Sequence, residues 1–93
     1  MTIAVLSLEL FLPMSHGLKD KRMVVRRLKD RLAKFNVSVA EVEHQDLWQR
    51  AGLAVAVAAS SDDMAEQTLQ SVMNEIERLE PGLVTRSHVD YLR

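Results

Sequence analysis

The sequence predicts an α+β fold in which two helices cover one face of a four-stranded antiparallel sheet. Three observations lead to this prediction. Four segments have the residue pattern of strands, two have the pattern of amphipathic helices, and the six follow one another in the order β-α-β-β-α-β. The chain has 93 residues, of which 47% are hydrophobic. This length and composition are typical of one globular domain, so we expect residues 1–93 to fold as a single unit.

The first strand is expected over residues 3–12, where apolar residues alternate. One face carries Ala4, Leu6, Leu8, Leu10 and Leu12. A period of two indicates a strand, because successive side chains point to opposite faces. Pro13 follows and ends the segment, since proline cannot donate a hydrogen bond to a neighbouring strand.

The first helix is expected over residues 18–35, where the apolar positions change to three- and four-residue spacing. The positions that form this stripe are Val24, Val25, Leu28, Leu32 and Phe35. Ser15 or Gly17 is the expected N-cap, because both residue types are favoured at that position. Asn36 stands where a left-handed C-cap residue often lies.

Two more strands are expected over residues 37–43 and 53–59. The first alternates and suggests a half-buried strand, whereas the second is apolar on both faces. A segment of the second kind is typical of a central strand that is covered on both sides.

The second helix is expected to begin at Ser60-Ser61-Asp62-Asp63, where hydroxyls can cap the helix and acids suit its positive end. Pro81-Gly82 stops this helix, and residues 83–92 form a last, more polar strand. The whole order is that of a ferredoxin-like sandwich with strand order 4-1-3-2. Its two central strands would be the two most apolar ones, 3–12 and 53–59.

The composition excludes several classes of protein. The chain has no cysteine, which excludes disulfides, thiolate zinc sites and a cysteine nucleophile. No apolar run reaches the roughly 18–20 residues that a membrane-spanning helix needs. The apolar start, residues 1–6, lacks the basic residues of a signal peptide. We therefore expect a cytoplasmic protein that does not associate with membranes.

Charge is distributed unevenly along the chain, although its net value is only −1. Residues 19–34 hold eight Lys and Arg against two Asp, a net charge of +6. Residues 62–80 hold six acidic residues against one Arg, a net charge of −5. A broad basic helix face can bind several phosphates by releasing counterions. The alternative is a solvated face that pairs with acids of the second helix. The candidate RNA- or anion-binding residues are Lys19, Lys21, Arg22, Arg26, Arg27, Lys29 and Arg31.

Lys21 differs from the other cations because its helical position falls on the apolar face, near Val25 and Leu28. One interpretation is a lysine that extends past the edge of the sheet to reach water. The other is a lysine whose ammonium group binds an anion near the first loop.

The segment from His44 to Arg50 is a second candidate contact surface. It contains groups that read RNA bases, namely a stacking ring, amides and a guanidinium group. Its candidate contact residues are His44, Gln45, Asp46, Trp48, Gln49 and Arg50. The structural alternative has Trp48 packed on the sheet edge, Asp46 capping a short turn, and Asp46 paired with Arg50 four residues on.

No pattern indicates a catalytic centre, a metal site or a cofactor. The histidines at 16, 44 and 88 are dispersed, and His44 with Asp46 would give two metal ligands at most. Glu41 and Glu43 would share one strand face and could form a carboxylate pair, although exposed acids are common on strands. Acylphosphatase-like enzymes have this topology, but they need an arginine in the loop that here reads Pro13-Met14-Ser15-His16-Gly17. We expect no enzyme, no catalytic residue, no metal and no cofactor.

Two stretches give the chain a family resemblance that covers nearly its whole length. Leu18-Lys19-Asp20-Lys21-Arg22 resembles the "SLKEKR" stretch of the bacterial YlxP-like family, a domain of unknown function. Phe35-Asn36-Val37-Ser38-Val39-Ala40-Glu41-Val42 and His44-Gln45-Asp46-Leu47-Trp48-Gln49-Arg50-Ala51 resemble its second signature. The chain has Gly17 where the family usually has Ser. The resemblance implies a ferredoxin-like fold in a bacterium, beside genes for translation initiation and ribosome maturation, and it implies no reaction.

Three functional hypotheses follow, in order of preference. The first is a non-enzymatic accessory protein that binds ribosomal RNA or a ribosomal subunit, with the basic helix on phosphates and residues 44–50 adding contacts. The second is a protein-interaction module that forms a homodimer through the open sheet face, where Ile3 and Val5 would otherwise be wet. The third is a small anion- or phosphoester-handling enzyme that uses Lys21 and His16.

Overall fold

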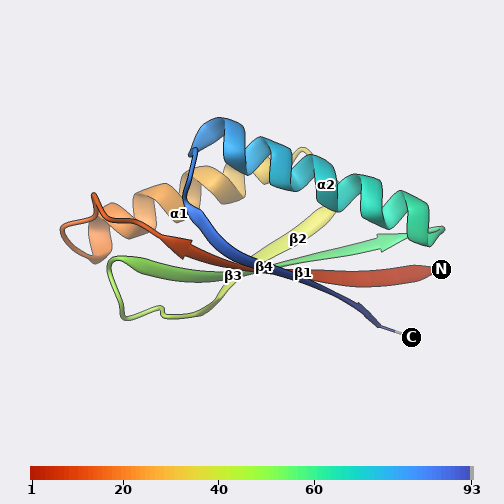
Figure 1. Cartoon of the computed structure of the whole chain (residues 1–93), viewed down its shortest axis with the longest axis horizontal. Coiled ribbons are helices and arrows are strands. Elements are labelled where there is room, and N and C mark those ends of the chain that lie inside the picture. Colours follow the sequence, from red (N-terminus) through yellow and green to blue (C-terminus); the bar gives the residue numbers. More distant parts are fainter. Residues whose placement is uncertain (93) are drawn as a thin grey trace.

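The computed structural model describes residues 1–92 and contains four strands and two helices in the expected order. They are β1 (Thr2–Phe11), α1 (Leu18–Leu32), β2 (Val37–Glu43), β3 (Arg50–Ala59), α2 (Asp62–Leu79) and β4 (Val84–Leu92). The sheet is antiparallel with the order β2-β3-β1-β4, which is 4-1-3-2 counted from the other edge. Both helices lie on the same face of the sheet (Figure 1). The ferredoxin-like prediction is therefore confirmed.

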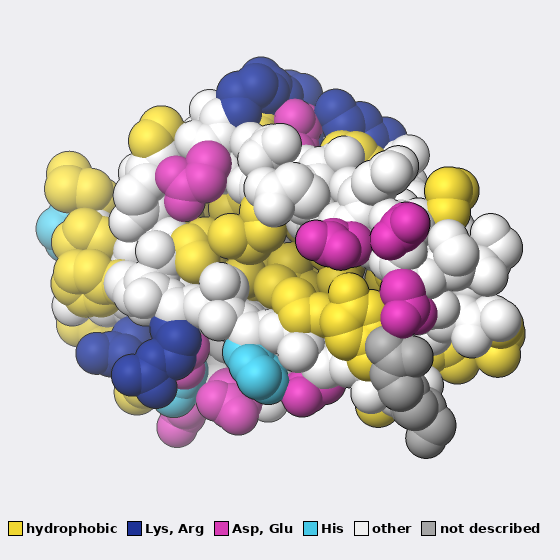
Figure 2. All heavy atoms as spheres, turned by 45° about the vertical axis from the view of Figure 1, so that its right-hand side comes forward, with side chains coloured by type: hydrophobic (Ala, Val, Ile, Leu, Met, Phe, Trp, Pro, Cys, Tyr) yellow, Lys and Arg dark blue, Asp and Glu magenta, His cyan; other side chains and the backbone are white. Residues whose placement is uncertain are grey.

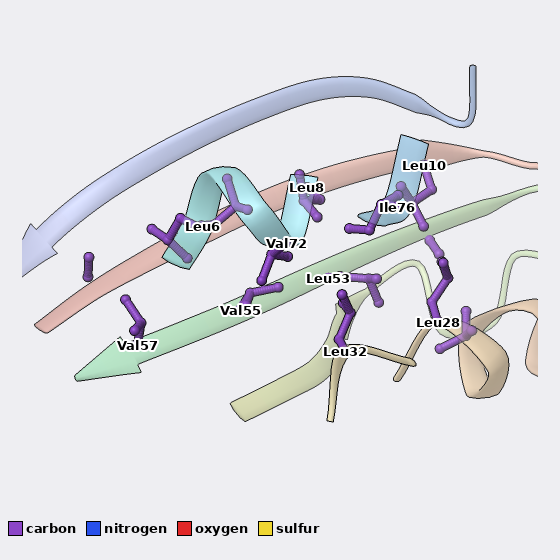
Figure 3. Packing of buried hydrophobic residues seen from close by; sticks show 14 of the residues in the cluster. Leu6, Leu8, Leu10, Leu28, Leu32, Leu53, Val55, Val57, Val72 and Ile76 are labelled. Atoms are coloured by element: carbon purple, nitrogen blue, oxygen red, sulfur yellow. The ribbon is translucent and has the colours of Figure 1, made fainter. Parts of the chain in front are cut away.

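The core lies between the helices and the two central strands. Alternate residues of β1 and β3 point toward the helices, and every third or fourth residue of each helix points back (Figure 3). The buried side chains include Leu6, Leu8 and Leu10 of β1, Leu53, Val55 and Val57 of β3, Leu28 and Leu32 of α1, and Val72 and Ile76 of α2. The central position predicted for β3 is correct. However, only one of its faces is covered by helices, because Ala54 and Ala56 are half-buried on the open face.

The ends of α1 differ from the prediction. The helix ends at Leu32 rather than at residue 35. Asn36 is not left-handed, and its amide nitrogen instead donates to the carbonyl oxygen of Ala58 at 3.2 Å. Gly17 is the N-cap, and no side chain caps the helix there. The carboxylate of Asp20 in the first turn accepts a hydrogen bond from the backbone N–H of His16, at 2.9 Å, and so ties the preceding loop to the helix.

The start of α2 agrees with the prediction. Ser61 is the N-cap, and its hydroxyl accepts a hydrogen bond from the backbone N–H of Met64 at 3.2 Å. After the helix, Gly82 has a φ of 79°, a left-handed conformation that glycine adopts without steric cost. Within residues 1–92, neither helix is long and apolar enough to cross a membrane.

Candidate functional site

The exposed face of α1 carries five cations that form no ion pair with any residue that the structure describes. Their side chains make no ion pair and no hydrogen bond to any described residue. These residues are Lys19, Arg22, Arg26, Lys29 and Arg31, and all five are exposed. Asp20 and Asp30 lie among them, which leaves a local net charge of +3. We call these five residues the basic face.

Two other cations of this segment are bound to α2 and the turn after it. Arg27 forms an ion pair with Glu80, and Lys34 lies 3.0 Å from the carboxylate of Glu75. The expected pairing with the second helix is therefore correct for these two and incorrect for the five residues of the basic face. Arg78 donates two hydrogen bonds to Glu75, at 3.1 and 2.9 Å, so this buried carboxylate is held from both sides.

These contacts shift the titration of Glu75. The hydrogen bonds from Arg78, and after them the one from Lys34, lower the pKa of this carboxyl from 4.5 to about 2, although desolvation opposes the shift. In return, Glu75 raises the pKa of Arg78. The acid is ionised at neutral pH and joins the end of α1 to α2.

Lys21 cannot contact RNA, which corrects its place among the candidate residues. Its side chain is fully buried. The ammonium group donates to the carbonyl oxygens of His44 at 2.6 Å, Gln45 at 3.3 Å and Arg50 at 3.2 Å, and it lies 2.9 Å from the carboxylate of Glu41. Neither of the two predictions for this residue is therefore right. The ammonium group of Lys21 does not reach water past the sheet edge. It also does not bind an external anion, because the carboxylate of Glu41 occupies that place.

The segment 44–50 connects β2 to β3, and most of its polar side chains form hydrogen bonds or ion pairs with neighbouring segments. The amide of Gln45 donates to the carbonyl oxygen of Glu41 at 3.2 Å. The amide of Gln49 donates to the carbonyl oxygens of Pro13 and Ser15, at 3.3 and 3.4 Å. This connection therefore lies against the loop between β1 and α1, at the end of the sheet away from the two termini (Figure 1).

Fewer side chains of this segment are available to contact RNA bases than the sequence suggested, because several already bind other parts of the protein. Trp48 is 46% exposed and is the ring that an unpaired base can stack on. Asp46 is exposed, but it does not pair with Arg50 as expected. Arg50 instead lies 3.5 Å from the carboxylate of Glu9 on β1.

A cluster of charged side chains on the open sheet face is the part of the molecule that the sequence did not predict. The ring nitrogen Nε2 of His44 lies 2.8 Å from Glu9 and 3.8 Å from Glu43. Arg86 and His88 line the same shallow depression, whose volume is about 120 Å³. The imidazole hydrogen bond, together with Arg50 and Arg86, lowers the pKa of Glu9.

A β-bulge creates this arrangement. The register between β2 and β3 shifts between Glu41 and Glu43, so that Val42 is the extra residue. Glu41 therefore faces Lys21 on the helix side, whereas Glu43 turns to the open face. The predicted pairing of Glu41 and Glu43 on one face is wrong for this reason.

Gly52 makes the close approach of the two strands possible. A Cβ atom at this position would lie 2.7 Å from the Cβ of Glu43, closer than real contacts allow. A glycine inside an apolar strand often marks a bulge or a close backbone contact. This residue was the one sequence signal from which the bulge could have been inferred.

Glu9, Glu43 and His44 could supply three ligands to a metal ion, because their ligand atoms all lie within 4.8 Å of one another. The sequence suggests His44 with Asp46 as a pair of ligands, whereas the structure places His44 beside Glu9 and Glu43. The guanidinium group of Arg50, 3.5 Å from Glu9, disfavours a cation at the same place. In the absence of a cation, these opposite charges neutralise one another across three strands.

Comparisons with known proteins bear on the family. Residues 3–89 match the model of the DUF503 family, which is described as "Protein of unknown function". The chain is 43% identical over 58 residues to a protein of Bacillus subtilis (strain 168) called "Uncharacterized protein YlxP". That alignment covers 61% of this chain and 63% of the relative, which is less than two thirds of the relative's length.

Solved structures bear on the fold alone. A de novo designed protein with a ferredoxin fold has a TM-score of 0.54 at 13% identity. The alignment covers 99% of this chain and 83% of the designed protein. A dimeric ferredoxin-like protein from an uncultured marine organism has a TM-score of 0.48 at 12% identity. The alignment covers 98% of this chain and 86% of that protein. The first of these likenesses agrees with the strand order and the layers described above.

Proposed function

The chain belongs to the DUF503 family of YlxP-like proteins, and we propose that it is a non-enzymatic, cytoplasmic accessory protein that binds ribosomal RNA or a ribosomal subunit. The observation that carries this proposal is the basic face, in which five exposed cations lie on one helix without an acidic partner among residues 1–92. The proposed ligand is an RNA backbone, because a row of phosphates can satisfy several such cations at once.

The way in which RNA would contact the protein follows from which cationic and aromatic side chains are exposed. Lys19 and Arg22 lie on the half of α1 that is nearer the connection 44–50, since Lys21 in the same half binds that connection directly, and Arg26 follows one turn later. Trp48 projects from it with 46% of its surface exposed. RNA that follows the basic face would place unpaired bases near this ring, where stacking contributes roughly 1–3 kcal/mol per base.

The open sheet face plays no part in this proposal. Domains that bind RNA on a four-stranded sheet stack bases on aromatic side chains of the central strands. The open face of β3 carries Gly52, Ala54, Ala56 and Ala58, and none of them can stack. The open face of β1 carries one aromatic residue, Phe11, at the very end of the strand. Phosphate contacts by α1 are thus the mode of binding that this fold offers.

The test is co-sedimentation with bacterial ribosomal subunits, together with binding to naked ribosomal RNA at a series of salt concentrations. Four or five phosphate contacts predict that the logarithm of the binding constant falls against the logarithm of salt with a slope of about −3 to −4.5. Arg26→Glu should weaken binding and flatten the slope. A binding constant insensitive to salt would contradict phosphate contacts.

A matched control separates the basic face from net charge. Gln67→Glu combined with Ser71→Glu changes the net charge by the same two units, at exposed positions of α2. This variant should retain most of the affinity. Equal losses in both variants would mean that only the overall charge matters, and the proposed surface would be wrong.

A further inference from the structure

Strand β4 presents a long, uncovered edge. It pairs with β1 on one side and has no neighbour on the other within residues 1–92. From Thr85 to Asp90 every residue is exposed, because α2 packs on β3 and β1 and leaves β4 uncovered. Proteins usually protect such edges with lysine, proline, a bulge in mid-strand or a short strand. Residues 86–92 contain no lysine, no proline and no mid-strand bulge, since the only register shift lies at the start of the strand. They do carry Arg86 and Asp90, but two charges of opposite sign do not exclude a second copy of the same strand.

The other edge of the sheet is different. Strand β2 has seven residues against nine in β4, and the bulge at Val42 interrupts its pairing. Bulges and short strands both hinder the addition of another strand. The β4 edge is therefore the one at which a further strand can pair.

The directions of the backbone groups in β4 follow from those in β1. The N–H of Phe11 donates to the carbonyl oxygen of Leu83 at 2.9 Å, just before β4 begins. Because backbone groups of successive residues point to opposite sides of a strand, the odd-numbered residues of β1 direct theirs toward β4. Their partners in β4 are the even-numbered Arg86, His88 and Asp90.

Ser87 and Val89 consequently direct their N–H and C=O groups away from the sheet. A second antiparallel strand can pair here only if the residues opposite them direct their own N–H and C=O groups toward β4. Another copy of β4 does so when Ser87 of one chain pairs with Val89 of the other. In this register the two-fold axis passes beside His88, the central residue of the strand Val84–Leu92, and all nine residues find partners.

The same register pairs opposite charges. It places Arg86 of each chain directly across from Asp90 of the other, on the open face of the combined sheet. These positions form non-hydrogen-bonded pairs, in which side chains lie closest and opposite charges stabilise a sheet. Shifting the register by two residues in either direction loses both Arg–Asp pairs.

The helix side of β4 offers apolar surface to the same partner. A groove of about 430 Å³ runs between α2 and β4, and its apolar lining consists of Leu6, Leu69, Met73, Val89 and Tyr91. Figure 2 shows hydrophobic side chains gathered in the middle of this face of the molecule. In the proposed register Val89 of the partner lies beside Ser87, at the rim of this groove, so pairing covers apolar atoms as well as backbone groups.

We propose that two copies of this chain associate through β4 to form a continuous eight-stranded antiparallel sheet, with Arg86 of each copy paired with Asp90 of the other. This inference is independent of RNA binding, because it uses none of the five residues of the basic face. It replaces the open sheet face, which the sequence suggested as the dimer contact, with the edge of the sheet.

The test is a charge-exchange experiment read by light scattering on micromolar protein. Wild type should have twice the 10.5 kDa mass of one chain. Arg86→Asp and Asp90→Arg should each weaken self-association, on the order of tenfold or more, because each variant places like charges opposite one another. An equimolar mixture of the two variants should form dimers again, since every pair then has opposite charges.

Circular dichroism of each variant first establishes that it folds, so that a monomeric mixture reports on the strand contact and not on misfolding. A proline at Val89 provides a second check. Its lost N–H points outward, so the variant should fold and remain monomeric. Val39→Pro, at the other sheet edge, should remain dimeric. A monomeric wild type, dimers of either single charge variant at wild-type affinity, or a monomeric mixture would each overturn the proposal.

Discussion

The ammonium group of Lys21 donates a 2.6 Å hydrogen bond to the carbonyl oxygen of His44, whose own backbone is left-handed with a φ of 61°. A left-handed conformation is uncommon for a residue other than glycine and is maintained by its surroundings. The imidazole of His44 also contacts Glu9 on the open face. One residue therefore links the buried lysine on one side of the sheet to the charged cluster on the other.

Lys21→Met should destabilise the protein by about 3–5 kcal/mol, because it leaves the carboxylate of Glu41 without its buried partner. Urea unfolding followed by circular dichroism measures this loss. Lys21→Met combined with Glu41→Met removes both charges and should recover part of the stability, although the carbonyl groups still lose their donor. A single variant within about 1 kcal/mol of wild type would contradict a structural role for Lys21.

Gly52→Ala should destabilise the protein by about 1–3 kcal/mol, because its Cβ would meet Glu43 at 2.7 Å and force the strands apart. Gly17→Ala is the matched control. Nothing lies within 4 Å of a Cβ at that position, and its backbone is extended. Thermal unfolding should therefore separate the two variants clearly, and equal melting temperatures would argue against a close strand contact at Gly52.

Glu75 should make the protein sensitive to acid. Its pKa is lowered in the folded state from 4.5 to about 2, so the ionised carboxylate stabilises the fold above pH 4.5, and this contribution is lost as the pH falls toward 2. Glu75→Gln should be less stable than wild type at neutral pH, and the difference should shrink across that acidic range. Glu66→Gln, at an exposed position of the same helix, should keep the wild-type pH profile.

Neighbouring arginines of α1 should contribute unequally to RNA binding. Arg26→Ala should reduce the magnitude of the salt slope by about 0.7–0.9, the effect of one lost phosphate contact. Arg27→Ala removes the same charge from the next residue, but that guanidinium group is already paired with Glu80. Its effect should be smaller, and fluorescence anisotropy with labelled RNA compares the two. A larger loss for Arg27→Ala would place the RNA on a different side of the helix.

The fold could be predicted because each element carries its own periodicity. The alternation in β1 and the three- and four-residue spacing in the helices depend only on near neighbours in sequence. The five residues of the basic face could be named for the same reason, since a charged residue off the apolar stripe of a helix points to solvent. The stretch 53–59 was correctly placed at the centre of the sheet, although Ala54, Ala56 and Ala58 face outward.

The contacts of Lys21 and the charged cluster could not be predicted, because they depend on pairing between distant segments. The partners of Lys21 lie 20 to 29 residues later in the chain, and Glu9 and His44 are 35 residues apart. Periodicity does not reveal a bulge either, since a bulge is defined by the count of residues on the opposite strand. The extra residue at Val42 reverses the face on which Glu43 lies and brings it to His44.

The position of β1 at the centre of the sheet has a consequence for synthesis on the ribosome. This strand is made first, yet its two neighbours are residues 50–59 and 84–92. At roughly 5–20 residues per second, the chain needs several seconds to progress from β1 to the end of β4. β3 can pair with β1 once residue 59 has been made, but the edge of β1 that pairs with β4 stays open for the whole interval. A nascent chain therefore carries the apolar strand β1 with one unpaired edge until residues 84–92 have been synthesised.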